Sequence, residues 1–144
     1  MCGSTAERSS LQTAALRCGA LRVVTASAAT RVEADWDQHV VPALDADELA
    51  RYTRFKEVLD AMTPSEPHWY LGLLGTRPDK QRTGVGRGLL EPMLSRAERE
   101  SLPVFLETGA QGNIDFYAQF GFEQIAEDTV PNGPVVWGLL KRAR

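Results

Sequence analysis

The segment Gln81-Arg82-Thr83-Gly84-Val85-Gly86 joins two closely spaced glycines to an amide, a guanidinium group and a hydroxyl. The apolar run Leu71–Leu74 before it predicts a buried strand, and the spacing after it predicts a helix. The first amides of a helix have no intrahelical partner and bind anions, and glycine leaves no Cβ to block a phosphate. These residues predict a phosphate-binding loop, with added positive charge from Lys80, Arg82 and Arg87. The alternative is a helix that follows a flexible loop with solvated basic side chains.

Two common phosphate-binding motifs do not match this loop. A Walker A loop requires a Gly-Lys pair, and none occurs in the sequence. A dinucleotide fingerprint requires G-x-G-x-x-G, but Gly88 comes one residue too early for it. The pattern present is Q/R-x-x-G-x-G, which resembles the acetyl-CoA loop of the GNAT acetyltransferase superfamily.

A second motif strengthens the resemblance. The segment Asn113–Phe122, NIDFYAQFGF, is similar to the N-x-x-F-Y-x-x-x-G-F signature that GNAT enzymes carry after their fifth strand. Further segments resemble the puromycin N-acetyltransferase branch of the superfamily: Glu66–Leu71, Leu102–Thr108, and Gly133-Pro134 followed by Trp137. The resemblance covers roughly Asp47 to Arg144.

The resemblance implies an α/β fold with a mixed sheet and an N-acetyltransferase that moves an acetyl group from acetyl-CoA to an amine of a small molecule or peptide. It implies that the cofactor's pantetheine lies where two strands separate and that the loop amides hold the pyrophosphate. The residues that match these cofactor-binding positions are Leu74, Thr76, Gln81, Arg82, Thr83, Gly84, Val85, Gly86, Arg87 and Asn113. An amide on the strand also stabilises the acetyl oxyanion in such enzymes.

Two residues are candidates for proton transfer. By the resemblance, Tyr117 is the general acid that protonates the departing thiolate; the alternative is an aromatic residue packed in the core. Glu107, at the carboxyl end of a predicted strand, is the candidate base for the amine, or else a structural ion pair. His68 titrates near neutrality, but it precedes a strand and is predicted to lie on the surface.

The elements around these residues predict a mixed sheet. Asp45 with Glu48 forms a capping box for a helix to Met62, whose apolar face carries Leu49, Tyr52, Phe55, Leu59 and Met62. A strand at 69–76, a helix from Thr83 to about Ser101 and a strand at 104–108 form a βαβ unit with parallel strands. Asn113 is predicted to cap a helix that runs to Phe120 and stops at Gly121, and an antiparallel pair at 122–127 and 135–141 closes the chain.

Residues 1–34 differ from the rest, because they are rich in Ser, Thr, Ala and Arg and poor in acids. This composition is typical of a divergent or disordered tail and also of an organelle transit peptide; we favour the tail. The GNAT-like domain is then residues 35–144, with one short strand predicted at Leu21–Thr25 within the tail.

Composition excludes several classes of protein. The 144 residues predict one domain, and a net charge of −3 argues against a nucleic-acid partner. No apolar run is long enough to span a membrane. Only Cys2, Cys18, His39 and His68 are available as soft ligands, so neither a metal site nor a disulfide framework is expected. The prediction is a reduced, cytoplasmic protein.

The sequence departs from the superfamily before Asp45, where the strands that normally precede 69–76 are missing or replaced. An apolar strand without its neighbour has an open edge, which predicts a homodimer or poor solubility unless Leu21–Thr25 covers it. Two alternatives remain at this point. One is a truncated relative that binds CoA or a partner without catalysis, and the other is an unrelated nucleotide-binding α/β protein.

Overall fold

The computed structural model describes residues 19–24 and 38–144. Five strands form one sheet in the order β1-β2-β3-β5-β4. Their bounds are Gly19–Val24 for β1, His68–Leu73 for β2, Val104–Thr108 for β3, Glu123–Thr129 for β4 and Val135–Lys141 for β5. The pair β2 and β3 is parallel, and the other pairs are antiparallel. The predicted mixed sheet, its βαβ unit and its closing antiparallel pair are confirmed.

The strand β1 pairs with the edge of β2 that was expected to be open. Its register runs antiparallel from Gly19 opposite Leu73 to Val24 opposite His68. The expectation of an exposed β2 edge is therefore wrong, because the backbone groups of β2 find partners in the N-terminal region of the same chain. The predicted short strand is confirmed, although Thr25 lies outside the described residues, as does most of the predicted tail.

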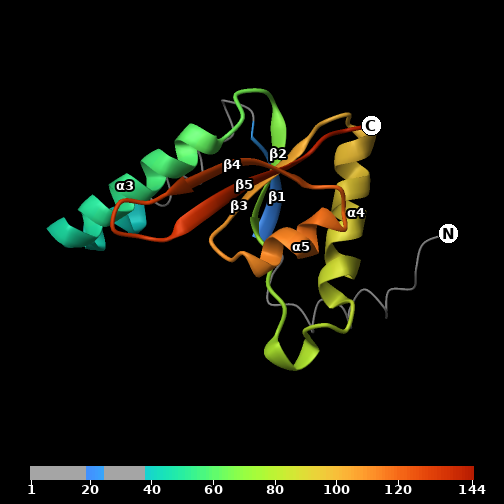
Figure 1. Cartoon of the computed structure of the whole chain (residues 1–144), viewed down its shortest axis with the longest axis horizontal. Helices are drawn as coiled ribbons and strands as arrows, with labels where there is room; N and C mark the ends of the chain where they lie inside the picture. The colour runs from blue at the N-terminus through green and yellow to red at the C-terminus, as the bar shows by residue number, and fades with distance from the viewer. Residues whose placement is uncertain (1–18, 25–37) are drawn as a thin grey trace.

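Helices cover both faces of the sheet (Figure 1). The helices α4, Val85–Arg99, and α5, Gly112–Ala118, lie on one face, and α3, Ala46–Met62, lies on the other. Side chains of a strand alternate between the faces, as β3 shows. Val104 and Leu106 belong to the cluster under α4 and α5, whereas Phe105 belongs to the cluster under α3.

The two clusters differ in size. The α4–α5 cluster contains ten buried residues: Trp69, Leu71, Leu90, Leu94, Ala97, Val104, Leu106, Tyr117, Phe122 and Leu139. The α3 cluster contains five: Met62, Phe105, Val130, Val136 and Leu140. Since each large apolar side chain stabilises the fold by about 1.5–3 kcal/mol when it is buried, most of the apolar stabilisation lies under α4 and α5.

The capping box predicted for α3 is present. Asp45 accepts a hydrogen bond from the Glu48 amide at 2.8 Å, and Glu48 Oε2 accepts one from the Asp45 amide at 3.0 Å. Only the second half of the helix packs on the sheet, through Val58, Leu59 and Met62. Two other residues of the predicted apolar face, Leu49 and Phe55, are 40% and 38% exposed.

Several element boundaries also differ from the predictions. The strand β2 ends at Leu73 rather than at residue 76, where its pairing with β1 stops. The helix α4 begins at Val85 rather than at Thr83, because Gly84 has a φ of 87° and cannot be helical. The helix α5 ends at Ala118, and Gly121 follows with a φ of 85°. No helix in residues 38–144 is long and apolar enough to cross a bilayer.

Candidate functional site

The glycine loop places backbone donors at the start of α4. Gly84, with its left-handed φ of 87°, is the N-cap, and the Gly88 amide donates to its carbonyl at 2.9 Å. The amides of Val85, Gly86 and Arg87 precede this first intrahelical bond and take no part in the helical ladder. Three adjacent donors at the positive end of a helix are the arrangement that favours an anion, so the local geometry is compatible with the predicted phosphate-binding loop.

Side chains of the loop bond to the loop itself. Gln81 Nε2 donates to the Thr76 carbonyl at 3.4 Å, and Thr83 Oγ1 donates to the Lys80 carbonyl at 2.6 Å. The turn before them is a short 3-10 helix, η2, at Pro78–Lys80. Gln81 and Thr83, both predicted to bind the cofactor, therefore act first on the shape of the loop.

Gly86 brings three parts of the chain together. A Cβ at Gly86 would lie 3.6 Å from Phe116 Cζ on α5 and 3.7 Å from Thr76 Oγ1 after β2. These are ordinary contact distances, so the glycine is not required for packing between the elements. Its effect is to leave the amide donors next to it uncovered.

The Arg87 side chain is engaged elsewhere. Its guanidinium donates to Glu91 Oε1 and to Gln119 Oε1, both at 3.3 Å, and lies 4.8 Å from the centre of the Phe120 ring. Arg87 thus connects α4 to the end of α5. Of the predicted basic side chains near the loop, Lys80 and Arg82 are exposed.

The strands β2 and β3 separate close to this loop. They pair at two positions, Trp69 with Val104 and Tyr70 with Phe105, and no further. Beyond this point β2 still pairs with β1 as far as Leu73, while β3 continues beside β5. Leu74 and Thr76, predicted to bind the cofactor through their backbone, follow β2 directly and lie past the separation.

Asn113 does not cap α5 as predicted. The N-cap is Gln111, and Asn113 lies inside the first turn. Its Nδ2 donates to Thr108 Oγ1 at 2.9 Å, and the same oxygen accepts the Ala110 amide at 3.2 Å. Asn113 therefore fixes the start of α5 to the end of β3, and its side chain is exposed next to the separated strands.

Tyr117 lies on the α4–α5 face. Its side chain is 8% exposed, and its ring packs edge-on against Phe116 at 5.1 Å and Phe122 at 5.5 Å between centroids. The ring belongs to the larger hydrophobic cluster. The structure thus gives Tyr117 a packing role, whatever its hydroxyl contributes to chemistry.

Glu107 lies on the opposite face, toward α3. It follows Phe105 by two residues in β3, and Tyr70 and Thr63 face its carboxylate. Burial raises the pKa of Glu107 above its ordinary value, the hydroxyls of Tyr70 and Thr63 oppose this rise, and Asp60 adds to it. Burial, and then the nearby Glu107 charge, raises the pKa of Tyr70. Glu107 and Tyr117 thus flank the separated strands from opposite faces of the sheet.

Two residues of this face were not predicted from the sequence. His68 is 1% exposed rather than on the surface; its Nδ1 lies 2.7 Å from the Glu66 carbonyl, and its ring meets Phe105 edge-on. Its Nε2 has no hydrogen-bond partner among the described residues. Tyr70 was missed as well. Alternation along β2 puts both side chains on the Phe105 face, and this period of two was the available signal.

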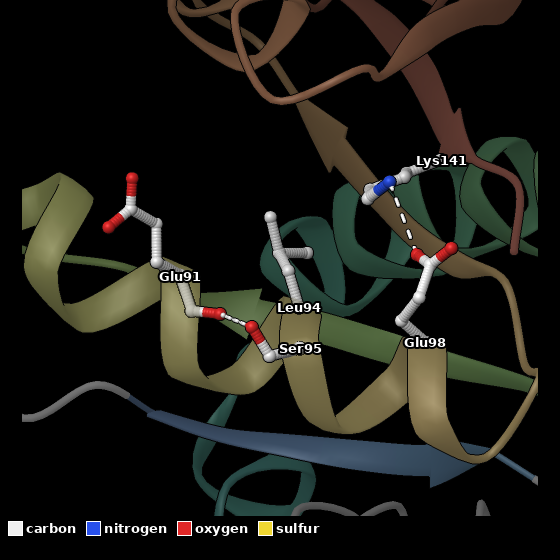
Figure 2. Close-up of a pocket in the computed structure, with 5 residues that line it drawn as sticks. All are labelled: Glu91, Leu94, Ser95, Glu98 and Lys141. Atoms are coloured by element: carbon white, nitrogen blue, oxygen red, sulfur yellow. Dashed lines mark hydrogen bonds and ion pairs between the residues drawn. The ribbon is translucent and has the colours of Figure 1, made fainter. Parts of the chain in front are cut away.

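A shallow hollow of about 360 Å³ lies along α4, away from the glycine loop (Figure 2). Figure 2 shows Leu94 at its centre, with Glu98 and Lys141 joined across it at 3.5 Å. The Arg144 amide donates to Glu98 at 2.8 Å and, with Lys141, lowers the pKa of Glu98. Ser95 donates to the Glu91 carbonyl at 2.9 Å. The polar groups around the hollow therefore bond to one another, and Glu98 holds Lys141 and Arg144 against α4.

Residues 12–122 match the Acetyltransferase (GNAT) family. The protein belongs to this family. The match begins well before residue 35 and so includes β1 in the GNAT region. No group of three or more His, Cys, Asp or Glu side chains in the described part of the GNAT chain is arranged to hold a metal ion.

The relatives are acetyltransferases. An uncharacterized N-acetyltransferase of Schizosaccharomyces pombe is 34% identical over 64 residues, which is 44% of this chain and 26% of the relative. The probable N-acetyltransferase san of Drosophila melanogaster is 26% identical over 98 residues, 60% of this chain and 53% of the relative. The match therefore spans between a quarter and about half of these relatives.

One solved structure supports the same assignment. The histone acetyltransferase HPA2 and related acetyltransferase from Corynebacterium glutamicum is 26% identical, with a TM-score of 0.51 over 57% of this chain and 45% of that one. The GNAT fold predicted from the two motifs is confirmed. The resemblance to the puromycin N-acetyltransferase branch is not tested by these matches and stays a prediction.

Proposed function

We propose that this chain is an N-acetyltransferase that transfers the acetyl group of acetyl-CoA directly to an amine of a small molecule or peptide. The observation that carries the proposal is the separation of β2 and β3 beyond Tyr70 and Phe105. A helix start suited to an anion lies on one face of the sheet there, and a partly buried carboxylate lies on the other. A cofactor and an acceptor that bind on opposite faces would meet between these strands.

The residues of the α4–α5 face fit acetyl-CoA, which supplies an acetyl group activated as a thioester. The amides of Val85, Gly86 and Arg87 would hold the pyrophosphate, since helix starts favour phosphate. Leu74 and Thr76 lie where β2 has lost its β3 partner, so their backbone groups are the ones to pair with an extended pantetheine. Exposed Lys80 and Arg82 would add charge for phosphate groups.

The proton transfers divide between the two faces. Glu107 would accept a proton from the attacking amine, and a pKa raised by burial brings this carboxylate closer to neutrality, where a general base works best. The amine nitrogen then forms its bond to the acetyl carbon, and the bond from that carbon to sulfur breaks. The Tyr117 hydroxyl would donate its proton to the departing thiolate, and a backbone amide near Leu74 would stabilise the acetyl oxygen.

A second function, CoA binding without turnover, is favoured by one observation. Tyr117 is packed among Phe116, Phe122 and the rest of the larger cluster, as expected of a residue that only fills the core. In that case the glycine loop would still bind CoA, but Glu107 and Tyr117 would not act on an acceptor.

The two functions are separated by two measurements on the purified chain. Calorimetric titration with CoA, and with ATP and NAD as controls, should show binding of CoA alone. Incubation of acetyl-CoA with a panel of small-molecule and peptide amines should then release free thiol. CoA binding without thiol release for any amine would favour the binding function, and no CoA binding would exclude both.

A further inference from the structure

Glu107 has a glycine opposite it on one neighbouring strand and no paired residue on the other. On β5, Gly138 is directly opposite Glu107 in the antiparallel register. On β2, the pairing with β3 ends at Tyr70 and Phe105, so Gly72 lies past the last paired position. Gly138 therefore offers no side chain that could fix the carboxylate.

The Tyr70 ring occupies the space that Gly72 leaves. A Cβ at Gly72 would lie 3.2 Å from Tyr70 Cε1, which is closer than most real contacts, so the ring extends over the glycine. The Phe105 ring is stacked against the Tyr70 ring at 6.4 Å between centroids and 30° between planes. On this face of the sheet, which Phe105 and Glu107 share, the Tyr70 hydroxyl is near enough to the Glu107 carboxylate to affect its ionisation.

We infer that Tyr70 is a positioning residue for Glu107, and that Gly72 is a glycine so that the Tyr70 ring can lie across it. The inference rests on the proposed function of Glu107 as a base. The Tyr70 hydroxyl fixes the direction of the carboxylate toward the separated strands and favours its ionised form. Without the hydroxyl, Glu107 keeps its place in β3 but loses this orientation.

Besides Tyr70, two polar groups of α3 act on Glu107. Asp60 on α3 faces it and is itself paired with Lys56 at 2.8 Å, and Thr63 on α3 contributes a hydroxyl. On β2, His68 lies on the same face two residues before Tyr70 and packs against Phe105. On β5 the opposite residue is Gly138. Tyr70 is therefore the titratable side chain of β2 that interacts directly with Glu107, and removal of its hydroxyl should change the pKa of Glu107.

The test uses Tyr70→Phe, which keeps the ring and its stacking and removes the hydroxyl. Because the hydroxyl favours the ionised carboxylate, its loss should raise the pKa of Glu107, observed by carbon NMR of the labelled side chain without substrate. In turnover, the acidic limb of the pH profile of kcat/KM should move to higher pH. The KM for acetyl-CoA should change by less than about twofold. Tyr52→Phe on α3 is the matched control and should leave the limb in place.

Gly72→Ala provides a second test. The φ of Gly72 is not in the left-handed region, so alanine causes no backbone strain there. Its Cβ would only crowd the Tyr70 ring. The substitution should move the acidic limb in the wild-type background but not in Tyr70→Phe, where no hydroxyl is left to displace. An unchanged Glu107 titration in Tyr70→Phe, or an equal effect of Gly72→Ala in both backgrounds, would overturn the inference. A chain that shows the NMR shift but turns over no amine would instead contradict the proposed function.

Discussion

The two faces of the sheet are built differently. The α4–α5 face carries the larger apolar cluster, and the left-handed Gly84 lies at the start of α4. The α3 face has half as many buried apolar residues, but it also buries His68 and holds Tyr70 against Glu107. One face is a rigid support for backbone donors, and the other is a smaller layer with titratable side chains.

This difference follows from what each face is proposed to do. Binding of a phosphate by amides requires the first turn of a helix to be held still, which extensive apolar packing provides. A carboxylate that serves as a base needs partial burial, which raises its pKa, and polar neighbours that limit the cost of burial. The two requirements conflict within one layer, and the sheet separates them.

The largest effect is expected from the acid on the α4–α5 face. Tyr117→Phe keeps the ring between Phe116 and Phe122 and removes only the proton donor, so the fold should be unchanged. The value of kcat should fall about 100- to 10,000-fold, with little change in acetyl-CoA affinity. Steady-state kinetics and CoA titration measure both quantities. Wild-type kcat would leave Tyr117 with a packing role alone.

The difference in packing predicts unequal costs of truncation. Leu90 on α4 is 0% exposed, and Phe55 on α3 is 38% exposed. Leu90→Ala should lower the free energy of unfolding by about 2–5 kcal/mol, and Phe55→Ala by less than about 1 kcal/mol. Urea denaturation of the two variants checks this. Equal losses would mean that Phe55 is buried against something else.

Gly84 and Gly112 provide a matched pair of smaller effects. A Cβ at either position would meet no atom within 4 Å, but only Gly84 has a positive φ. Gly84→Ala should therefore destabilise the protein by about 1–2 kcal/mol through backbone strain alone. Gly112→Ala should change stability by less than about 1 kcal/mol, because alanine suits a helix. Similar melting of both variants would show that the loop relaxes freely.

The smallest expected effect is the pH dependence that Glu107 gives to stability. Its pKa is raised in the folded protein above the ordinary value of 4.5. The folded state therefore holds this proton more tightly, and the free energy of unfolding falls as pH rises above that value, until the folded group has also ionised. Glu107→Gln should remove this fall, so that wild type and variant diverge with rising pH. Denaturation curves that stay parallel from about pH 4 to about pH 8 would contradict the raised pKa.

The local geometry of the glycine loop could be predicted from the sequence better than the contacts of the α3 face. Gly84 and Gly86 could be interpreted because their roles depend on a local strand, loop and helix. The contact between Tyr70 and Glu107 depends on the register of two strands 35 residues apart and on a glycine at position 72, which no local pattern reveals. His68 was misplaced because its burial depends on Phe105, a neighbour across the sheet.

The N-terminal side was the least predictable. The composition of residues 1–34 indicated a tail, yet β1 completes the pairing of β2 and the family match reaches back to residue 12. A strand of six residues carries little periodic signal of its own, and its partner, β2, lies more than 40 residues later in the chain. Asn113 was wrongly predicted to cap α5 for a similar reason, because its side chain bonds to Thr108 on β3 instead.

Under the proposed function, CoA binds on the α4–α5 face, where β2 and β3 separate. The most direct test is a titration of the labelled protein with CoA, followed through the backbone amide signals by NMR. We predict that the largest shifts occur at Val85, Gly86 and Arg87 and at Leu74, Thr76 and Asn113, with the first half of α3 unaffected. Shifts confined to α3, or to the hollow between Glu98 and Lys141, would contradict the claim.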